Sequence, residues 1–564
     1  MENTAFGIEY RPRTGSEAMC EALLDEGVEF LFGYPGGAIM PFYDALVDYP
    51  LKHVLVRHEQ AAAHAADGYA RATGKVGVCV ATSGPGATNL VTGLATAYMD
   101  SVPLVAITGQ VGRAAMGKDA FQETNVTGMT LPVTKHSFLV EEPEELYPTM
   151  RRAFAIARSG RPGPVLVDVP KDVQFAAVSG NGYRQLREAP PPIPAPALEA
   201  AARLIERARR PIILAGHGVT LSGAELELRM LAERCGIPVS TTLLGISCFP
   251  DDHPLNIGMP GMHGAASVNR AIDRSDLLIA VGMRFDDRIT GNPEKFAPNA
   301  KVIHIDVDPS EMGKVVRPTV GIVADAKLAL GGVLNHLRKS PECGAWREEL
   351  AVDQAPERRK EAEARGRFGP VRIMEAIREA TGGEVRLVTD VGQHQMWAAR
   401  HFRYTRPNSH ITSGGLGTMG FALPAAMGVA LACPEESVWV VAGDGGIQMN
   451  IQELATIRDL GLNIKVAVIN NGYLGMVRQW QQFFHNRRYS ETPITGPDYE
   501  TLAAAYGLTG RTVREGDDVE RVVRWAEERE GFTILDFHID PEQNVYPMIP
   551  SGMSVAEMIE EDDA

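Results

Sequence analysis

The stretch that decides the fold is VWVVAGDGGIQMNIQELATIRDLGLNIKVAVINN, residues 438–471. It contains two continuous apolar runs, VWVVA and IKVAVI, with a helix-like segment between them. Apolar runs without strict alternation are typical of strands that are buried on both faces, as in a parallel sheet covered by helices. A right-handed crossover through the middle segment places the two strand ends side by side. The stretch therefore predicts a βαβ unit.

The ends of these two predicted strands carry oxygen ligands. Asp444 follows the first run, and Asn471 follows the second. Magnesium prefers near-octahedral oxygen coordination and usually takes only one or two carboxylates, with water and substrate phosphates completing the shell. Gly443, Gly445 and Gly446 allow backbone amides to approach a diphosphate at the start of the following helix. We therefore favour a magnesium–diphosphate site over a plain glycine-rich turn capped by an aspartate.

Similar apolar runs recur through the chain, which at 564 residues is longer than one hydrophobic core comfortably fills. Together they predict an α/β protein made of three doubly wound parallel-sheet domains, with ligands beyond the carboxyl ends of the strands. The further runs are HVLVRHE, VGVCVAT, PLVAITG, GPVLVDVP, PIILAGHG, DLLIAVGM and KVIHIDVD, which begin at residues 53, 76, 103, 163, 211, 276 and 301.

Two changes in composition divide the chain into these domains. Residues 186–202 hold five prolines, from Pro190 to Pro196, which predicts an extended spacer without a helix. Residues 341–370 are charged and weakly apolar, which predicts a solvated helical connector. We expect domains at residues 10–185, 195–345 and 368–555.

Composition and charge restrict the class of protein. The net charge of −16 opposes binding to nucleic acid. The six cysteines form no CxxC pair and indicate buried free thiols in a reducing cytoplasm, and the N-terminus shows no targeting segment. Residues 407–434 are uncharged apart from His410 and long enough to span a membrane, but four glycines and Pro424 favour a loop and a short buried helix.

The motifs resemble those of a known family. GDG followed about 25 residues later by NN resembles the signature of thiamine-diphosphate enzymes, and the three segments resemble their pyrimidine, central and diphosphate domains. Within that superfamily, the chain resembles the catalytic subunits of acetolactate synthases from about residue 10 to residue 555. Strings that carry this resemblance include GYPGGAIMPFYDAL from Gly33, RHEQAAAHAADGYARATGK from Arg57, TSGPGATN from Thr82, RFDDR from Arg284, SGGLGTMGF from Ser413 and LGMVRQW from Leu474.

The resemblance implies roles in holding thiamine diphosphate. Glu59 alone reads as an acid in the first turn of a helix, where it favours the helix dipole; in the family, a carboxylate here contacts the aminopyrimidine ring and promotes loss of the C2 proton. The loop from Thr82 lies against that ring, and Asn89 stands where a dinucleotide-binding motif requires its third glycine. The implied cofactor residues of the third domain are Val391, Gly392, Gln393, His394, Gly417, Met419, Asp444, Gly445 and Gly446, and the implied magnesium ligands are Asp444, Asn471 and the carbonyl of Tyr473.

The resemblance also implies FAD in a role without net redox chemistry, and a site for a second substrate. Read alone, the GHG at Gly216 fits an ordinary turn, RFDDR fits a solvated loop, and Trp480 fits a core position. The resemblance implies that Arg288 binds the carboxylate of the second 2-oxo acid and that Trp480 packs against it, with Gln122, Lys171 and Phe121 lining the channel. The implied FAD contacts are Arg161, Gly216, Arg284, Asp306 and Asp325.

The expected activity is decarboxylation of pyruvate and transfer of the remaining two carbons to pyruvate or 2-oxobutyrate, the first common step of branched-chain amino-acid synthesis. Glu59 and the metal site fall in different domains, and the family builds each site across two subunits, so we expect a homodimer or homotetramer, together with a regulatory small subunit. Two alternatives are a flavin-linked pyruvate oxidase and a catalytically silent scaffold protein. RFDDR and Trp480 argue against the first, and Glu59, Asp444 and Asn471 argue against the second.

Overall fold

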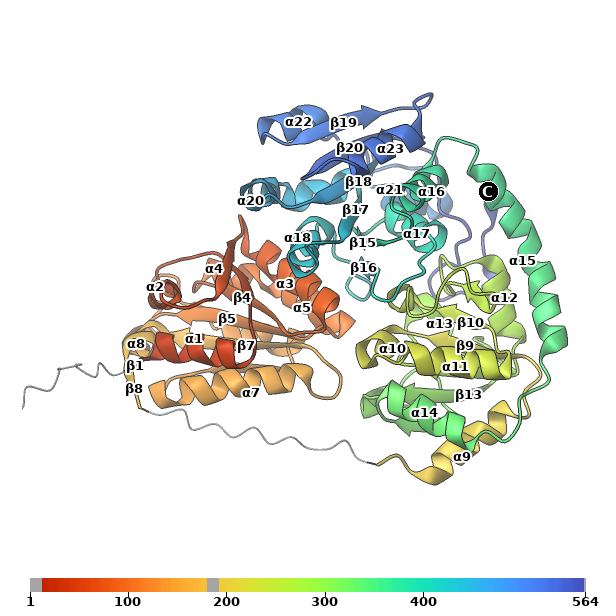
Figure 1. Cartoon of the computed structure of the whole chain (residues 1–564), viewed down its shortest axis with the longest axis horizontal. Coiled ribbons are helices and arrows are strands. Elements are labelled where there is room, and N and C mark those ends of the chain that lie inside the picture. The colour runs from red at the N-terminus through yellow and green to blue at the C-terminus, as the bar shows by residue number, and fades with distance from the viewer. Residues whose placement is uncertain (1–12, 180–191, 562–564) are drawn as a thin grey trace, which may run out of the picture. The chain divides into compact units, whose positions relative to one another are not determined.

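The computed structural model describes residues 13–179 and 192–561, and it contains two compact units, residues 1–188 and 189–564. Figure 1 shows that each main sheet is flanked by helices on both faces. There are three such sheets in the described residues, one in the first unit and two in the second, and every pairing within them is parallel. The predicted α/β fold with three parallel-sheet domains is confirmed.

The first unit is built on a six-stranded sheet in the order β3-β2-β4-β5-β7-β6, with a separate two-stranded ribbon, β1-β8. Its strands are β1 (Arg13–Thr14), β2 (Phe30–Gly33), β3 (Lys52–Leu55), β4 (Gly77–Ala81), β5 (Leu104–Gln110), β6 (His136–Leu139), β7 (Pro164–Pro170) and β8 (Ala177–Val178). Its helices are α1 (Gly15–Asp25), α2 (Met40–Leu46), α3 (Glu59–Thr73), α4 (Pro85–Asn89), α5 (Val91–Asp100), α6 (Val126–Thr130), α7 (Leu146–Arg158) and α8 (Lys171–Phe175), with short 3-10 turns η1 (Arg113–Ala115), η2 (Leu131–Val133) and η3 (Pro143–Glu145).

The central sheet, in the second unit, has the order β11-β10-β9-β12-β13-β14. Its strands are β9 (Pro211–Ala215), β10 (Val239–Thr241), β11 (Asn256–Gly258), β12 (Leu277–Val281), β13 (Lys301–Asp306) and β14 (Val320–Val323). The helices around it are α9 (Ala195–Ile205), α10 (His217–Ser222), α11 (Glu225–Cys235), α12 (Ala266–Arg274), α13 (Asp287–Thr290) and α14 (Ala326–His336), with η4 (Leu243–Gly245) and η5 (Pro309–Glu311).

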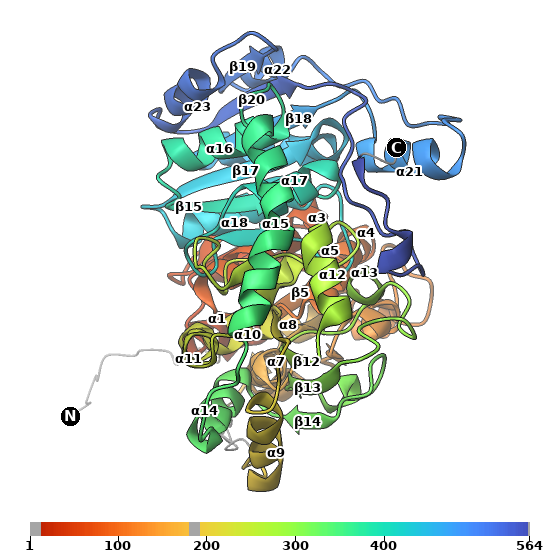
Figure 2. The same cartoon turned by 90° about the vertical axis from the view of Figure 1, so that its right-hand side faces the viewer.

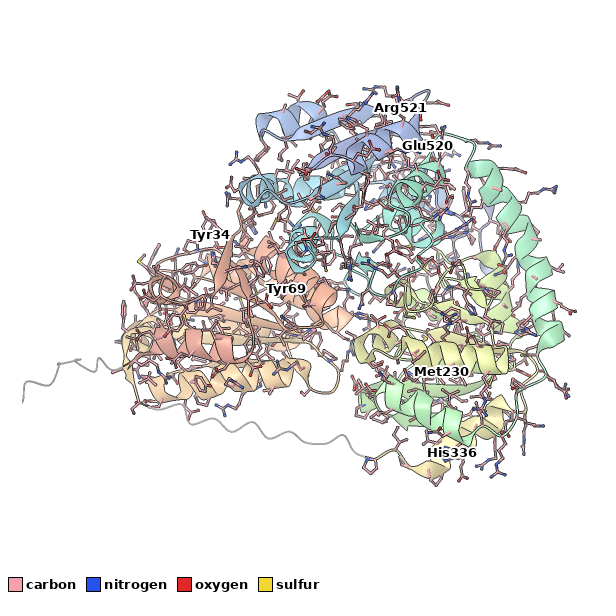
Figure 3. All side chains as sticks on the ribbon, in the orientation of Figure 1. Tyr34, Tyr69, Met230, His336, Glu520 and Arg521 are labelled. Carbon is pink, nitrogen blue, oxygen red and sulfur yellow. The ribbon has the colours of Figure 1, made fainter. Side chains whose placement is uncertain are left out.

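The third sheet has the order β16-β15-β17-β18-β20-β19. Its strands are β15 (Val385–Thr389), β16 (His410–Thr412), β17 (Ser437–Gly443), β18 (Ile464–Asn470), β19 (Thr509–Val513) and β20 (Thr533–His538). Its helices are α16 (Pro370–Ala380), α17 (Gln393–His401), α18 (Ala422–Ala432), α19 (Asp444–Ile447), α20 (Leu454–Leu460), α21 (Gly475–Phe484), α22 (Tyr499–Ala505) and α23 (Val519–Glu527), with η6 (Gln448–Glu453) and η7 (Val555–Glu557). On α23, which Figure 3 marks by Glu520, that carboxylate receives two hydrogen bonds from Arg372 of α16, of 2.8 and 2.7 Å.

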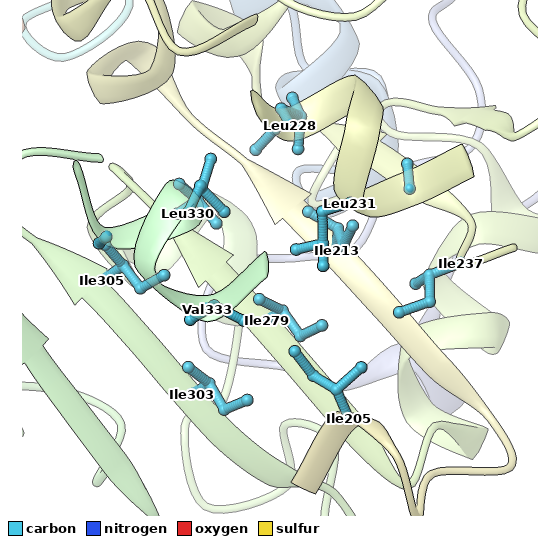
Figure 4. Packing of buried hydrophobic residues seen from close by; sticks show 14 of the residues in the cluster. Ile205, Ile213, Leu228, Leu231, Ile237, Ile279, Ile303, Ile305, Leu330 and Val333 are labelled. Carbon is cyan, nitrogen blue, oxygen red and sulfur yellow. The ribbon is translucent and has the colours of Figure 1, made fainter. Parts of the chain in front are cut away.

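Side-chain patterning decides which helix faces are buried. Leu228 and Leu231 of α11 lie in the apolar cluster drawn in Figure 4, together with Ile213 of β9 and Ile279 of β12. Met230 of the same helix is 49% exposed on the outer side. This spacing is the expected result of a helix that packs one stripe against a sheet.

All nine apolar runs predicted as strands form strands. Eight of them are buried nearly throughout, as expected for parallel strands covered by helices on both faces. The exception is the run from His53, which forms β3 at the edge of the first sheet, where Leu55 is 45% exposed. The charged connector forms α15 (Gly344–Ala364), the long helix of Figure 2, and of its side chains only Trp346 and Leu350 are buried. One expectation is wrong in part: α9 begins at Ala195, so Pro196 lies in the first turn of a helix, where its missing N–H costs nothing. The expected domain end near residue 185 lies outside the described residues.

The uncharged stretch at 407–434 contains β16, a glycine-rich loop and the 11-residue α18. Within the part of the chain that the structure describes, no helix is long and apolar enough to cross a membrane. Five of the six cysteines are buried, and Cys433 is half-buried.

Candidate active site

The residues of the predicted diphosphate site lie at the carboxyl ends of the strands of the third sheet. In its strand order β16 lies on one side of β15 and β17 on the other, so the sheet reverses its direction of winding between β15 and β17. Ligands of doubly wound sheets bind at the carboxyl ends of strands at this kind of switch point. Val391 and Gly392 follow β15 there, and Asp444 follows β17. The predicted residues therefore meet where the topology favours a ligand.

Two of the three predicted metal ligands, Asp444 and Asn471, follow neighbouring strands. β17 and β18 pair in parallel, and the amide of Gly472 donates to Asp444 Oδ2 at 2.9 Å. Asn471 Oδ1 accepts from the amide of Tyr473 at 3.1 Å, and both Asp444 and Asn471 are buried. Burial raises the pKa of Asp444 to about 7, which is the desolvation cost that a bound cation would offset.

Glycines line the adjacent turn because nothing larger fits. A Cβ on Gly443 would lie 2.8 Å from His394 Nδ1, and a Cβ on Gly446 would lie 2.6 Å from Asp390 Oδ1. A Cβ on Gly445 would lie 2.8 Å from Leu474 Cδ2. Real Cβ atoms essentially never approach other atoms so closely, so this buried turn favours glycine, although the Leu474 side chain is flexible enough to move for a Cβ on Gly445.

Three further predicted residues, His394, Met419 and Gly417, lie at this edge. His394 Nε2 is buried without a hydrogen-bond partner, and burial lowers the pKa of this histidine to about 3, so the ring is neutral. A buried polar atom of this kind fits a ligand that supplies the missing hydrogen bond. Met419 Cε lies 3.5 Å from the position of a Cβ on Gly445, and Gly417 adopts a φ of 71° beside Val391. The residues present thus fit a diphosphate with its cation.

The donor set at this edge fits magnesium. It offers one carboxylate, one amide oxygen and main-chain carbonyls, which are the hard oxygen ligands that this ion prefers. In the described part of the chain, no group of three or more His, Cys, Asp and Glu side chains could hold a metal ion, so a site rich in such ligands is not formed there.

Sequence reasoning missed Asp390 and Gln479, which support this edge. Asp390 is buried and accepts hydrogen bonds from the amides of Val391, Gly420 and Ala422, and burial raises its pKa to about 6. Its position directly after an apolar run is a signal that sequence reading could have used. Gln479, on α21, is fully buried, and no feature of the sequence distinguishes it from its neighbour Gln481.

In the first unit, Glu59 opens α3 directly after the β3 loop, as predicted. Its Oε2 accepts a 2.9 Å hydrogen bond from the side-chain amide of Asn89, the last residue of α4. A Cβ on Gly86 would lie 3.2 Å from Glu59 Oε1. The loop from Thr82 therefore lies against the carboxylate, which contributes to holding it in one orientation.

Gln122 lies on a loop with defined backbone support. It adopts a φ of 60°, and its backbone lies 2.9 Å from the position of a Cβ on Gly84. The carboxylate of Glu123 accepts from the amides of Gly117 and Ala120, and hydrogen bonds from backbone amides lower its pKa. Gln110 Nε2 donates to the carbonyl of Thr124 at 2.8 Å, so both ends of the loop are held.

Other predicted residues of the first unit lie at the surface or near it. Lys171 opens α8 directly after β7, and Phe121 is 88% exposed. Arg161 Nε donates to Ser101 Oγ at 2.8 Å. The first unit therefore brings Glu59 and the Thr82 loop together, while Arg161 belongs to a different unit from the other predicted FAD residues.

Four of the predicted FAD residues lie at the carboxyl edge of the central sheet. Gly216 follows β9, Arg284 follows β12, Asp306 ends β13, and Asp325 follows β14 as the N-cap of α14. Position 216 requires glycine, because a Cβ there would lie 2.4 Å from the carbonyl oxygen of Gly282. These residues share one edge and fit a dinucleotide laid across it.

The predicted substrate residues of the second unit are partly exposed. Asp286, in RFDDR, caps α13 through the amides of Arg288 and Ile289, and the Arg288 side chain is 59% exposed. Trp480 of α21 is half-buried, with its ring centroid 5.2 Å from that of Phe484. Neither residue is part of a closed core, which leaves both accessible to a ligand.

Comparison with known families matches this architecture. Three models describe this chain in order: the N-terminal TPP binding domain of thiamine pyrophosphate enzymes at residues 13–129, their central domain at 198–333, and their C-terminal TPP binding domain at 390–537. Each matched region contains one of the three sheets or most of it. Thiamine pyrophosphate, which is thiamine diphosphate, is therefore the cofactor of this fold.

Relatives that are similar over nearly the full length share one name. The chain is 48% identical to the acetolactate synthase large subunit of Parasynechococcus marenigrum, over 97% of this chain and 91% of that protein. It is 46% identical to the acetolactate synthase isozyme 2 large subunit of Escherichia coli, over 97% of this chain and 99% of that protein. A probable acetolactate synthase large subunit of Methanocaldococcus jannaschii is also 46% identical, over 97% of this chain and 95% of that protein. With its three sheets, its intact strand-end residues and this similarity, the chain belongs to the acetolactate synthase family of thiamine pyrophosphate enzymes.

Proposed function

We propose that this chain catalyses acetolactate synthesis. One pyruvate loses carbon dioxide, and its remaining two carbons form a bond to the carbonyl carbon of a second 2-oxo acid. With pyruvate as acceptor the product is 2-acetolactate, and with 2-oxobutyrate it is 2-aceto-2-hydroxybutyrate. The observation that carries this proposal is the near-full-length similarity to proteins named acetolactate synthases.

We assign the metal and diphosphate to the edge of the third sheet. Asp444, Asn471 and the carbonyl of Tyr473 would hold Mg²⁺, which would supply positive charge to offset a bound diphosphate in a protein whose own net charge is negative. Bound thiamine diphosphate supplies stabilisation of the carbanion formed when carbon dioxide leaves. The residues that hold the cofactor here are Val391, Gly392, Gln393, His394, Gly417, Met419, Gly445 and Gly446. The orphaned His394 Nε2 and the glycine turn support this assignment.

Glu59 would contact the aminopyrimidine ring of the cofactor, and its carboxylate would exchange a proton there. Its Oε2 is already occupied by Asn89, so Oε1 is the oxygen free of that hydrogen bond. A positioned carboxylate contributes about 10²–10⁴-fold to a rate through proton transfer of this kind.

The substrates contact other residues. Arg288 pairs with the carboxylate of the second 2-oxo acid, and Trp480 packs against the additional methyl group of 2-oxobutyrate. Gln122, Lys171 and Phe121 line the approach to the site. The exposed guanidinium of Arg288 and the half-buried indole of Trp480 support these roles, because both are accessible to a ligand.

We propose that FAD binds along the carboxyl edge of the central sheet without net redox work. The central sheet has the strand order 3-2-1-4-5-6 when its strands are numbered from β9, which is typical of dinucleotide-binding sheets. Gly216 and Arg284 follow the two strands that flank its switch point, β9 and β12. The further contacts are Arg161, Asp306 and Asp325. A flavin absorption spectrum of the purified protein tests this assignment.

Assembly and location are proposed from the similarity to the relatives. Relatives named large subunits support a regulatory small subunit as partner, and we propose a homodimer or homotetramer in the cytoplasm. We propose domain limits of 10–185, 195–345 and 368–555.

The deciding experiment measures products from pyruvate with thiamine diphosphate and Mg²⁺, without an added oxidant. We expect 2-acetolactate and carbon dioxide in equal amounts. Formation of acetate that depends on an electron acceptor would identify a pyruvate oxidase instead, and no consumption of pyruvate by the folded, cofactor-loaded protein would contradict an enzymatic role.

A further inference from the structure

Gln479, in the middle of α21, makes a two-point pairing with one residue of the C-terminal segment. The backbone amide of Val545 donates to Gln479 Oε1 at 2.9 Å, and Gln479 Nε2 donates to the carbonyl of Val545, also at 2.9 Å. A backbone N–H only donates and a carbonyl only accepts. The backbone of Val545 therefore fixes which end of the Gln479 amide is oxygen and which is nitrogen.

The orientation of Gln479 fixes that of Gln393, the first residue of α17. Gln393 Nε2 donates to Gln479 Oε1 at 2.8 Å and to the carbonyl of Gln543 at 3.1 Å. Both acceptors are oxygens, so the amino end of Gln393 must face them. Its Oε1 is then turned toward Asn471, whose Nδ2 donates to it at 3.1 Å.

The last amide in this series is the proposed metal ligand. Because the amino end of Asn471 is held by Gln393, its Oδ1 is directed the other way, where it accepts from the amide of Tyr473. Only the oxygen of an asparagine amide binds Mg²⁺, so a flipped Asn471 would present N–H groups to the cation. All three amide side chains are buried, at 0%, 3% and 7% exposure for Gln479, Gln393 and Asn471, so water does not compete for these hydrogen bonds.

We propose that Gln479, acting through Gln393, is a positioning residue that keeps the oxygen of Asn471 directed at the cation. This inference rests on the metal site proposed above and extends it to a residue on a different helix. It also explains why an uncharged amide is buried in the middle of α21, where an apolar side chain would otherwise pack better.

The test is the affinity for Mn²⁺, read from the electron paramagnetic resonance signal of the free ion in the presence of thiamine diphosphate. Gln479→Met keeps the side-chain length and removes the amide. We expect it to weaken Mn²⁺ binding by about 10–100-fold, the usual effect of losing a partner that orients a metal ligand. If Gln479→Met does not fold, Gln479→Leu takes its place, because Gln393 is itself proposed to hold the cofactor and its loss would weaken Mn²⁺ binding by either route.

A matched control lies on the same helix. Gln481 makes the same two-point pairing with the backbone of Ser490, at 3.0 Å in both directions, and has no hydrogen bond to Gln393 among those the structure gives. Gln481→Met should leave Mn²⁺ affinity within about twofold of the parent, because it removes an equal pairing outside the series.

Testing Gln479→Met in a second parent, the Asn471→Asp variant, separates a loss of side-chain orientation at position 471 from a general disturbance of the structure. In Asn471→Asp both side-chain oxygens are equivalent, so no orienting residue is needed, and adding Gln479→Met should cause no further loss of Mn²⁺ affinity. An equal loss in both backgrounds, or no loss in either, would overturn the proposed role of Gln479. Asp444→Ala tests the metal site itself: if it leaves Mn²⁺ affinity unchanged, the proposed site fails, whereas its loss alongside an inert Gln479→Met refutes only the positioning role.

Discussion

The first and third sheets share one topology and differ in what their strand ends carry. Numbered within each domain, both have the strand order 2-1-3-4-6-5. After the third strand of the first sheet come Thr82, Ser83 and Gly84, whereas after the third strand of the third sheet come Asp444 and Gly445. The loop of the first sheet lies against the carboxylate of Glu59, and the loop of the third sheet forms a turn beside the side-chain oxygens of Asp444 and Asn471, which we propose bind the metal.

The same scaffold thus presents different residues at equivalent strand ends, and we propose that these residues decide which part of the cofactor each sheet binds. The second strand of the first sheet leads to Glu59, while the second strand of the third sheet leads to the glycine-rich loop containing Gly417. The first sheet can therefore provide proton transfer, and the third can provide the charge neutralisation and the diphosphate contacts.

The largest expected effect is on the reaction rate, through Glu59 of the first unit. Glu59→Gln removes the proton-transferring oxygen and should lower the rate of acetolactate formation by about 10²–10⁴-fold, with thiamine diphosphate still bound. Deuterium exchange at the cofactor C2 position, followed by NMR, should slow in parallel. As a control, Glu29→Gln removes a surface carboxylate of the same unit, which forms an ion pair with Lys75. Unchanged exchange in the folded Glu59→Gln variant would remove Glu59 from this role.

The second effect is on metal affinity, through Asp444 at the end of a strand of the third sheet. Asp444→Ala deletes the only carboxylate proposed for the metal and should weaken Mn²⁺ affinity by more than about 100-fold, beyond the loss typical of an orienting partner. Thr82→Ala changes the corresponding strand end of the first sheet and should leave Mn²⁺ affinity unchanged. Tight Mn²⁺ binding by Asp444→Ala would mean that the metal does not bind at this strand end of the third sheet.

The third effect is on stability. Gly446→Ala places a methyl group 2.6 Å from Asp390 Oδ1 and should destabilise the protein by about 1–3 kcal/mol, as overpacking of a buried site does. Gly37→Ala, at a turn of the first unit with no atom within 4 Å of the new Cβ, is the matched control. Denaturant unfolding followed by circular dichroism measures both. Equal stability of the two variants would contradict the close packing at Gly446.

The fourth effect is on substrate choice. If the indole of Trp480 packs on the additional methyl group, Trp480→Leu should reduce the preference for 2-oxobutyrate over pyruvate by about 10-fold, within the range that one methylene provides. A competition at fixed pyruvate with varied 2-oxobutyrate, counting both hydroxy acids, gives the ratio. An unchanged ratio with an active variant assigns Trp480 to packing alone.

The smallest effect is on the pH dependence of stability in the first unit. Asp168 is buried against Thr108 and Gln110, and desolvation raises its pKa to about 7, above its unfolded value of about 4. The folded state therefore binds this proton more tightly, and its contribution to stability falls as the pH rises from about 4 to about 7. The melting temperature of Asp168→Asn minus that of the parent should therefore increase as the pH is raised from 5 to 8. A difference that does not change with pH would contradict this interpretation.

Much of the fold and part of the site follow from the sequence alone. Buried runs such as VWVVA and IKVAVI predict parallel strands because only sheets covered on both faces exclude polar residues so completely. Asp444 and Asn471 are predictable because strand ends carry function in such sheets. Gln479 is not, since its role depends on the backbone of Val545, 66 residues away, and no local pattern encodes that contact. The helix that begins at Ala195 was missed because prolines favour both spacers and first helical turns.

The most direct test of the division between the two sheets is a mixing experiment with Glu59→Gln and Asp444→Ala, each inactive alone. If two copies of the chain complete each site, with the first sheet of one copy and the third sheet of the other, then a mixed dimer holds one intact site. Random exchange of subunits should then restore about a quarter of the parent acetolactate-forming activity. Activity that stays at the sum of the two separate variants after verified subunit exchange would contradict the account.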